Sequence, residues 1–282
     1  MNTWYQQPLY GGEQAVTAEM KLLFFGDVVG KGGREALKLA VPELRRKFNA
    51  QFVIVNGENS AAGAGLSGSC LRELSLVADV ITGGDHVWDQ KGFETEIREF
   101  PNFIRPANLS KLQPGRPWGV FQNPAGGEVA VISLLGKVFM RDSAYCPFET
   151  VERIVEHELP PTAKTIVVDF HAEATSEKIA MAHFLDGKVT AVLGTHTHVR
   201  TADARILPGG TAAVSDVGMC GAESSVLGRE IPAVLKKFRT GMPVRLPVVE
   251  KGAIRLDGVL ITYDAATGRA SAVEGFSETV QI

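Results

Sequence analysis

The chain has 282 residues, of which 45% are hydrophobic, so it can bury a sizeable core as one large domain or two small ones. Its formal net charge of −3 creates no general attraction to nucleic acid or to an anionic membrane. No apolar run approaches the ~18 residues that are needed to cross a bilayer. We therefore expect neither a stable nucleic acid partner nor a membrane span.

The three cysteines, Cys70, Cys146 and Cys220, are widely spaced and odd in number. They form neither a CxxC pair nor a disulfide framework, and we expect them to be ordinary packing thiols. This use of cysteine suits a reducing compartment, and the sequence therefore predicts a cytoplasmic location.

The first nineteen residues lack the basic start and the apolar stretch of a secretory signal. Met20 and Lys21 directly precede the first strong strand pattern. We expect residues 1–19 to be a disordered leader, an upstream start or an expression remnant, and residues 20–282 to form a single domain.

Along the rest of the chain, short apolar runs alternate with amphipathic stretches. The predicted strands are Leu22–Phe25, Phe52–Val55, Val80–Thr82, Val129–Leu134, Thr165–Phe170 and Val189–Leu193. The predicted helices are Gly33–Phe48, Leu71–Val77, Phe148–Glu158 and Ser176–Leu185. This alternation indicates an α/β fold with a largely parallel sheet. After about residue 205 the pattern changes to short strands and turns, ending in a hairpin over Ala253–Ala272.

Five of the predicted strands are followed by side chains that can bind a metal. These side chains are Asp27; Glu58 and Asn59; Asp85, which is followed by His86; His171; and His196 and His198. In an open α/β sheet, the loops at the carboxyl ends of parallel strands lie along one edge. The five loops are therefore expected to converge, although they span about 170 residues of sequence.

The candidate ligands are oxygen and imidazole groups without a thiolate, a set that suits Mn, Fe, Zn or Mg. Seven ligands are more than one ion needs, whereas two ions about 3.5–4 Å apart need roughly that many and share one carboxylate. His196 and His198 are two residues apart, so in extended chain they point the same way with Cα atoms roughly 7 Å apart.

Each candidate also has a structural explanation when it is taken alone. Asp27 fits a helix N-cap or a turn, and His171 fits a hydrogen-bonded core histidine. Residues 105–108 (Arg-Pro-Ala-Asn) fit either a phosphate or sugar contact or an ordinary surface loop. The conjunction favours a functional site, because four of the six histidines follow strands while His157 and His183 lie in helical patterns and are expected to be structural.

Several motifs together resemble the YmdB-like branch of the calcineurin-type metallophosphoesterases. They are Gly26-Asp27, the Asn-Gly-Glu-Asn turn at 56–59, a Gly-x-His ending at 86, the segment Asp169–Lys178 and Gly194-Thr-His-Thr-His198. The resemblance runs from about Met20 to the C-terminus. It implies a sandwich of two β-sheets flanked by helices, a dinuclear iron or manganese centre and a homo-oligomer. It also implies hydrolysis of 2′,3′-cyclic nucleotides and related phosphodiesters.

The resemblance also implies a role for each matching position. Asp27 and His198 would bind one ion, with Asn59 nearby. His171, His196 and the residue at position 85 would bind the other ion, and Glu58 would bridge the two. A metal-bridging hydroxide would attack phosphorus, and His86 would act as the general acid that protonates the departing ribose oxygen.

Position 85 departs from the family pattern, which has Gly-Asn-His where this chain has Gly84-Asp85-His86. If Asp85 is a ligand, three anionic ligands instead of two face the +4 charge of two divalent ions. The centre should then hold cations more firmly but polarise phosphate less. Alternatively, Asp85 turns away from the metals and accepts a hydrogen bond from a loop amide.

Two other functions remain open at this point. The same centre suits a general phosphomonoesterase, and it also suits a regulatory protein that binds metal without catalysis. In the second case, His86 would merely orient a ligand.

Overall fold

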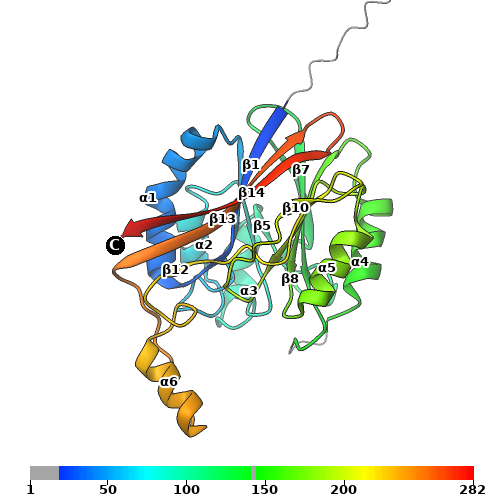
Figure 1. The fold of residues 1–282 in the computed structure, drawn as a ribbon. Helices are drawn as coiled ribbons and strands as arrows, with labels where there is room; N and C mark the ends of the chain where they lie inside the picture. The colour runs from blue at the N-terminus through cyan, green and yellow to red at the C-terminus, as the bar shows by residue number, and fades with distance from the viewer. Residues whose placement is uncertain (1–18, 141–143) are drawn as a thin grey trace, which may run out of the picture.

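The computed structural model describes residues 19–140 and 144–282. The predicted leader, residues 1–19, lies outside the described residues except for Glu19, at which strand β1 begins. Two β-sheets face each other, with α1 and α2 on the outer side of one and α4 and α5 on the outer side of the other (Figure 1). The α/β sandwich that the family resemblance implies is therefore confirmed.

The first sheet has the strand order β2-β12-β13-β1-β3-β4-β5, with β14 paired to β13. Strands β1, β3, β4 and β5 are parallel, and β13 runs antiparallel to its neighbours. Its strands are β1 (Glu19–Phe25), β2 (Asp27–Val28), β3 (Phe52–Asn56), β4 (Val80–Thr82), β5 (Phe103–Ile104), β12 (Met219–Ala222), β13 (Ala253–Asp264) and β14 (Ala270–Gln281).

The second sheet has the order β10-β11-β9-β8-β7-β6, in which β7, β8, β9 and β11 are parallel. Its strands are β6 (Trp118–Gln122), β7 (Glu128–Leu135), β8 (Thr165–His171), β9 (Ala191–Thr195), β10 (Arg205–Ile206) and β11 (Ala212–Val214). The helices are α1 (Gly30–Phe48), α2 (Gly68–Leu74), α3 (Phe93–Glu96), α4 (Pro147–Arg153), α5 (Thr175–Phe184) and α6 (Ile231–Thr240). A 3₁₀ turn (Ile97–Glu99) follows α3, and a π-helical turn (Ile154–Glu158) follows α4.

Successive residues of β1 show how the sequence builds three apolar layers. Leu23 and Phe25 pack under α1 and α2, whereas Leu22 and Phe24 pack between the two sheets, because side chains alternate between the faces of a strand. A third apolar cluster joins the second sheet to α4 and α5. Both faces of the central strands are thus covered, which explains their continuous apolar runs.

Two features of the sequence-based interpretation were wrong. The predicted strands do not share one sheet: β1, β3 and β4 belong to the first, and β7, β8 and β9 to the second. An apolar run shows that a strand is buried but not which strand lies beside it. The region after residue 205 also contains α6, for which Pro232 in its first turn and Gly241 at its C-cap were the available signals.

Gly26 allows a close approach that places the next residue, Asp27. A Cβ atom at Gly26 would lie 2.0 Å from the carbonyl oxygen of Gly218, in the turn before β12. The Asp27 amide donates to that same carbonyl over 3.1 Å. The glycine is therefore required for the end of β1 to pack against this turn.

Among the described residues, no helix is both long and apolar enough to cross a membrane.

The layer between the sheets should dominate stability. Phe24 is fully buried there, so Phe24→Ala should lower the free energy of unfolding by about 3–5 kcal/mol, through lost burial and the cavity left behind. Phe139 is 86% exposed, and Phe139→Ala should change this free energy by less than about 0.5 kcal/mol. Urea denaturation of both variants measures the difference, and equal effects would contradict the assignment of Phe24 to the core.

Candidate metal centre

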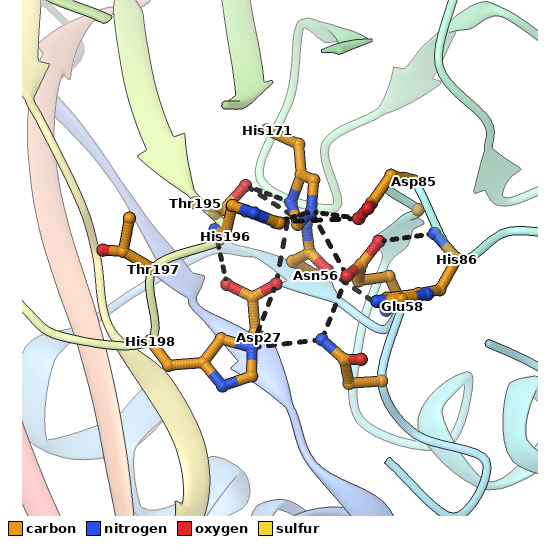
Figure 2. A network of polar contacts seen from close by, with 12 residues as sticks. Asp27, Asn56, Glu58, Asp85, His86, His171, Thr195, His196, Thr197 and His198 are labelled. Atoms are coloured by element: carbon orange, nitrogen blue, oxygen red, sulfur yellow. Dashed lines mark hydrogen bonds and ion pairs between the residues drawn. The ribbon is translucent and has the colours of Figure 1, made fainter. Parts of the chain in front are cut away.

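The predicted ligands come together where the carboxyl ends of the strands of both sheets meet (Figure 2). Asp27 follows β1, and Glu58 and Asp85 follow β3 and β4 of the first sheet. His171 ends β8 and His196 follows β9 of the second sheet. The expected convergence of the loops occurs, but it joins two sheets instead of lying along one edge.

One group of donors surrounds the ring of His171. Its Nε2 atom lies 3.2 Å from Glu58 Oε1, 3.1 Å from Asp85 Oδ1 and 3.0 Å from His196 Nδ1. One donor atom from each of these four residues lies within 4.8 Å of the others. Such a group can hold a metal ion, and the carboxylate of Asp85 points into it instead of turning away.

A second group adjoins the first and contains Asp27, Asn59 and His198. Asp27 Oδ1 lies 3.9 Å from His198 Nε2 and 3.6 Å from His171 Nδ1. Asn59 presents its amide NH₂ group, which donates to Glu58 Oε1 over 3.0 Å and lies 3.1 Å from His198 Nε2. Glu58 therefore lies between the two groups.

Asp27 provides a direct test of whether a cation fits. The residue is fully buried, and its Oδ2 atom accepts the backbone N–H of His196 over 3.0 Å. Its Oδ1 atom is also buried but has no hydrogen-bond partner. A buried carboxylate oxygen without a partner is costly, whereas an ion at that position would satisfy it. The donor set fits a metal ion at this point.

The pKa values of the site also favour added positive charge. Burial alone would lower the pKa of His171, but the negative charges of Glu58, Asp85 and Asp27 outweigh burial and raise this pKa well above its usual value. Burial, assisted by the nearby His171, lowers the pKa of His196 to about 4, so that this imidazole is neutral and able to ligate. Because His196 is neutral, the positive charge of the imidazoles offsets only part of the negative charge of the carboxylates. The group therefore attracts a cation.

Hydrogen bonds behind the first donor group orient His171. Thr195 Oγ1 lies 2.9 Å from His171 Nδ1, so that Nε2 faces the donor group. Thr195 in turn donates to Asp169 Oδ1 over 2.7 Å. Asp169 also accepts hydrogen bonds from Asn56, over 2.9 Å, and from Thr82. Such outer contacts fix the tautomer and direction of a ligating imidazole.

A second set of contacts fixes the turn that carries both later histidines. His196 and His198 have φ angles of 102° and 64°, in the left-handed region that non-glycine residues rarely adopt. Between them, Thr197 donates its backbone N–H and hydroxyl to Asp216 over 3.0 Å and 2.8 Å. Asp216 is held by the buried Lys178 over 2.7 Å. The strained turn is thus anchored from behind.

Sequence reasoning missed these supporting residues. Asp169 and Lys178 lie inside the segment that resembles the family, so their position was a usable signal. Asp216 comes from a separate turn, and only the fold brings it to Thr197.

His86 lies beside the donor groups without being part of them. Its side chain is 28% exposed, its Nδ1 atom lies 2.8 Å from Asp89 Oδ2, and its backbone N–H donates to Glu58 over 3.3 Å. It borders a cavity of about 400 Å³ that Glu58, His196 and His198 also line. Asp89 was not predicted, although its spacing of three from His86 was a signal.

The loop at residues 105–108 is structural. Arg105 is 3% exposed and donates to the main-chain oxygens of Pro106, Pro114, Ser110 and Gln113. Asn108 bonds to the backbones of Leu135 and Tyr145. Neither side chain is free to contact a phosphate, so the alternative of a substrate contact is not supported.

The structure leaves His157 and His183 exposed on helical segments, and neither lines the cavity.

Two facing sheets with carboxylates and imidazoles gathered at their common end define a metallophosphoesterase-type protein, a metal-dependent phosphoric ester hydrolase. Residues 23–276 match the family described as YmdB-like protein. The 2′,3′-cyclic-nucleotide 2′-phosphodiesterase of Bacillus subtilis (strain 168) is 44% identical over 257 residues, which cover 90% of this chain and 96% of that protein. The chain therefore belongs to the YmdB-like family, and the predicted resemblance is confirmed.

Two crystal structures support the same assignment. A novel phosphatase from Mycoplasma pneumoniae is 33% identical, with a TM-score of 0.86, and the match covers 94% of this chain and 95% of that one. A hypothetical protein from Thermus thermophilus is 36% identical, with a TM-score of 0.84, and the match covers 92% of this chain and 99% of that one.

The position of Asp85 leads to a prediction about metal affinity. Asp85→Asn removes one negative charge from the first donor group, so it should raise the dissociation constant for Mn²⁺ by at least about tenfold. At saturating metal the less negative centre should attract and polarise phosphate better, so the rate on a phosphodiester should rise. Calorimetric titration measures the affinity, with Glu94→Gln on the exposed side of α3 as the control. Equal affinities in Asp85→Asn and the unaltered protein would exclude Asp85 as a ligand.

Proposed function

We propose that the protein is a phosphodiesterase that hydrolyses 2′,3′-cyclic nucleotides or related phosphodiesters at a centre of two transition-metal ions. The observation that carries the proposal is the pair of adjoining donor groups with Glu58 between them. The activity of the Bacillus subtilis relative supports the choice of substrate class.

The donors support two ions of iron or manganese. His171, His196 and Asp85 would hold one ion, and Asp27 and His198 the other, with Glu58 shared. Asn59 would join the second ion only through its amide oxygen, since an amide nitrogen is not a ligand. Mixed imidazole and carboxylate ligands without a thiolate suit these metals. When bound, such ions polarise a phosphate and activate water.

His86 is suited to protonate the leaving oxygen. It borders the cavity next to the donors, and Asp89 accepts from its Nδ1 position, which leaves Nε2 for the substrate. The carboxylate of Asp89 orients the ring. A general acid of this kind is needed most when the leaving group is a poorly acidic ribose hydroxyl.

We further propose a cytoplasmic homo-oligomer. The three cysteines are free, as expected of a reducing compartment. Helix α6 projects from the sandwich in Figure 1 and exposes Ile231, which is 42% accessible, and Met242, two residues beyond the end of the helix, is 62% accessible. Apolar exposure of this kind suits contact with a second copy.

Reconstitution tests the proposed centre and the substrate together. Protein loaded anaerobically with Mn²⁺ or Fe²⁺ should bind two ions per chain and should hydrolyse 2′,3′-cyclic AMP faster than linear diesters or monoesters. Preference for monoesters would instead indicate a general phosphomonoesterase, and two tightly bound ions without turnover would indicate a regulatory metal-binding protein. A limit of one ion per chain in excess metal would exclude the dinuclear centre.

Replacing His86 should separate proton donation from metal binding. His86→Ala should leave the metal content unchanged and slow 2′,3′-cyclic AMP hydrolysis by about 10²–10⁴-fold, the usual range for general acid catalysis. A p-nitrophenyl diester has a good leaving group and should lose much less. Asp89→Asn, which keeps the imidazole, should give a smaller loss with the same dependence on the leaving group. Equal losses on both substrates would assign His86 a positioning role.

A further inference from the structure

The cavity that borders the donor groups continues onto an apolar wall that none of the roles above uses. This wall consists of Val29, Val226, Leu227, Val234, Phe238 and Leu246. It comes from α6, from the segments on either side of it and from the residue before α1. Val234 is buried, whereas Phe238, one turn later on α6, is 76% exposed. An aromatic ring is thus available beside the centre.

We propose that this wall binds the base of the nucleotide substrate, with the ring of Phe238 as its main contact. The inference rests on the proposed function, because it takes the phosphate to lie at the donor groups. In a 2′,3′-cyclic nucleotide the phosphate bridges the 2′ and 3′ oxygens of the ribose. The base is attached to C1′, which is the carbon next to C2′. The base therefore lies one sugar ring away from the phosphate. A phosphate bound at the donor groups would place the base near the adjoining wall.

The size and composition of the cavity match this occupant. A volume of about 400 Å³ lies in the range of small-molecule sites and exceeds what a phosphate alone fills. Its lining combines two kinds of residue, the polar Glu58, His196 and His198 and the apolar side chains of the wall. A cyclic nucleotide has the same division into an anionic part and a flat ring, and every base has a face that stacks on an aromatic side chain.

Arg229 holds the wall together and does not read the base. Among the described residues that line the cavity, Arg229 is the one arginine, and lysine is absent from them. Its guanidinium donates to the main-chain oxygens of Leu246, over 3.0 Å, of Ala62, over 3.4 Å, and of Gly63. These bonds connect the loop after β3 to the segment after α6.

A wall of this composition predicts weak discrimination between bases. Selection of one base over another requires buried donors or acceptors that the wrong base leaves unpaired, and apolar side chains provide none. The values of kcat/KM for the four 2′,3′-cyclic nucleotides should therefore lie within about tenfold of each other. A preference of about a hundredfold or more for one base would overturn the proposal.

The decisive comparison uses substrates with and without a base. In the metal-loaded protein, Phe238→Ala should raise KM for 2′,3′-cyclic AMP by about tenfold, since a base stacked on an aromatic ring contributes an effect of this order. The kcat should change by less than about twofold. The same variant should leave KM for glycerol 1,2-cyclic phosphate unchanged, because that substrate has no base. Phe238→Trp should keep the affinity for the nucleotide.

Leu235→Ala is the matched control. Leu235 lies on the same helix and is 51% exposed, but it does not line the cavity. It should leave both KM values unchanged, and light scattering should show the same mass for all variants. Equal changes with both substrates, no change with the nucleotide, or a parallel change in Leu235→Ala with altered mass would each overturn the base site. If the unaltered protein hydrolyses neither cyclic phosphate, the proposed function fails first, and the base site falls with it.

Discussion

The hydrogen bonds of one buried carboxylate, Asp169, connect the parts of the structure on which the site depends. Asp169 is near the end of β8, and it accepts from Thr195 at the end of the neighbouring β9 and from Asn56 and Thr82 at the ends of β3 and β4. It therefore joins the carboxyl ends of two sheets whose facing layer is largely apolar. Since Thr195 also contacts the ring of His171, the same bonds that align the sheets direct this ring into the donor group.

The second constraint is the concentration of negative charge at that junction. Asp27 and Glu58 are fully buried, and Asp85 is directed toward the same space. Burial of several carboxylates together is unfavourable unless a cation or a proton compensates for it. Burial raises the pKa of Asp27 well above its usual value, whereas His171 and the neighbouring groups lower the pKa of Asp85. The arrangement is costly for the protein alone, and a bound cation would remove that cost.

Helix α6 borders the cavity beside the donor groups without contributing to them. Sequence periodicity missed this helix because it packs little against the core: Val234 is its buried residue, and the remainder is partly or fully exposed. The same sparse packing leaves Phe238 beside the cavity. The strained turn between His196 and His198 was likewise invisible in sequence, because its anchor Asp216 comes from a distant loop. Features that depend on contacts between remote segments were the ones that local patterns could not predict.

The sequence by itself determined which strands are buried and which side chains follow them. A local apolar run indicates a buried strand, and the polar residues after the run indicate where the strand ends. It thereby predicted the side chains, from Asp27 to His198, that the structure brings close together. Only the tertiary structure decided that these strands form two sheets and that Asp85 points into the cluster. It also decided that the guanidinium of Arg105 donates its hydrogen bonds to main-chain oxygens. These outcomes depend on which segments become neighbours. Packing and hydrogen bonding over the whole chain determine which segments become neighbours, and the sequence of a single segment does not predict it.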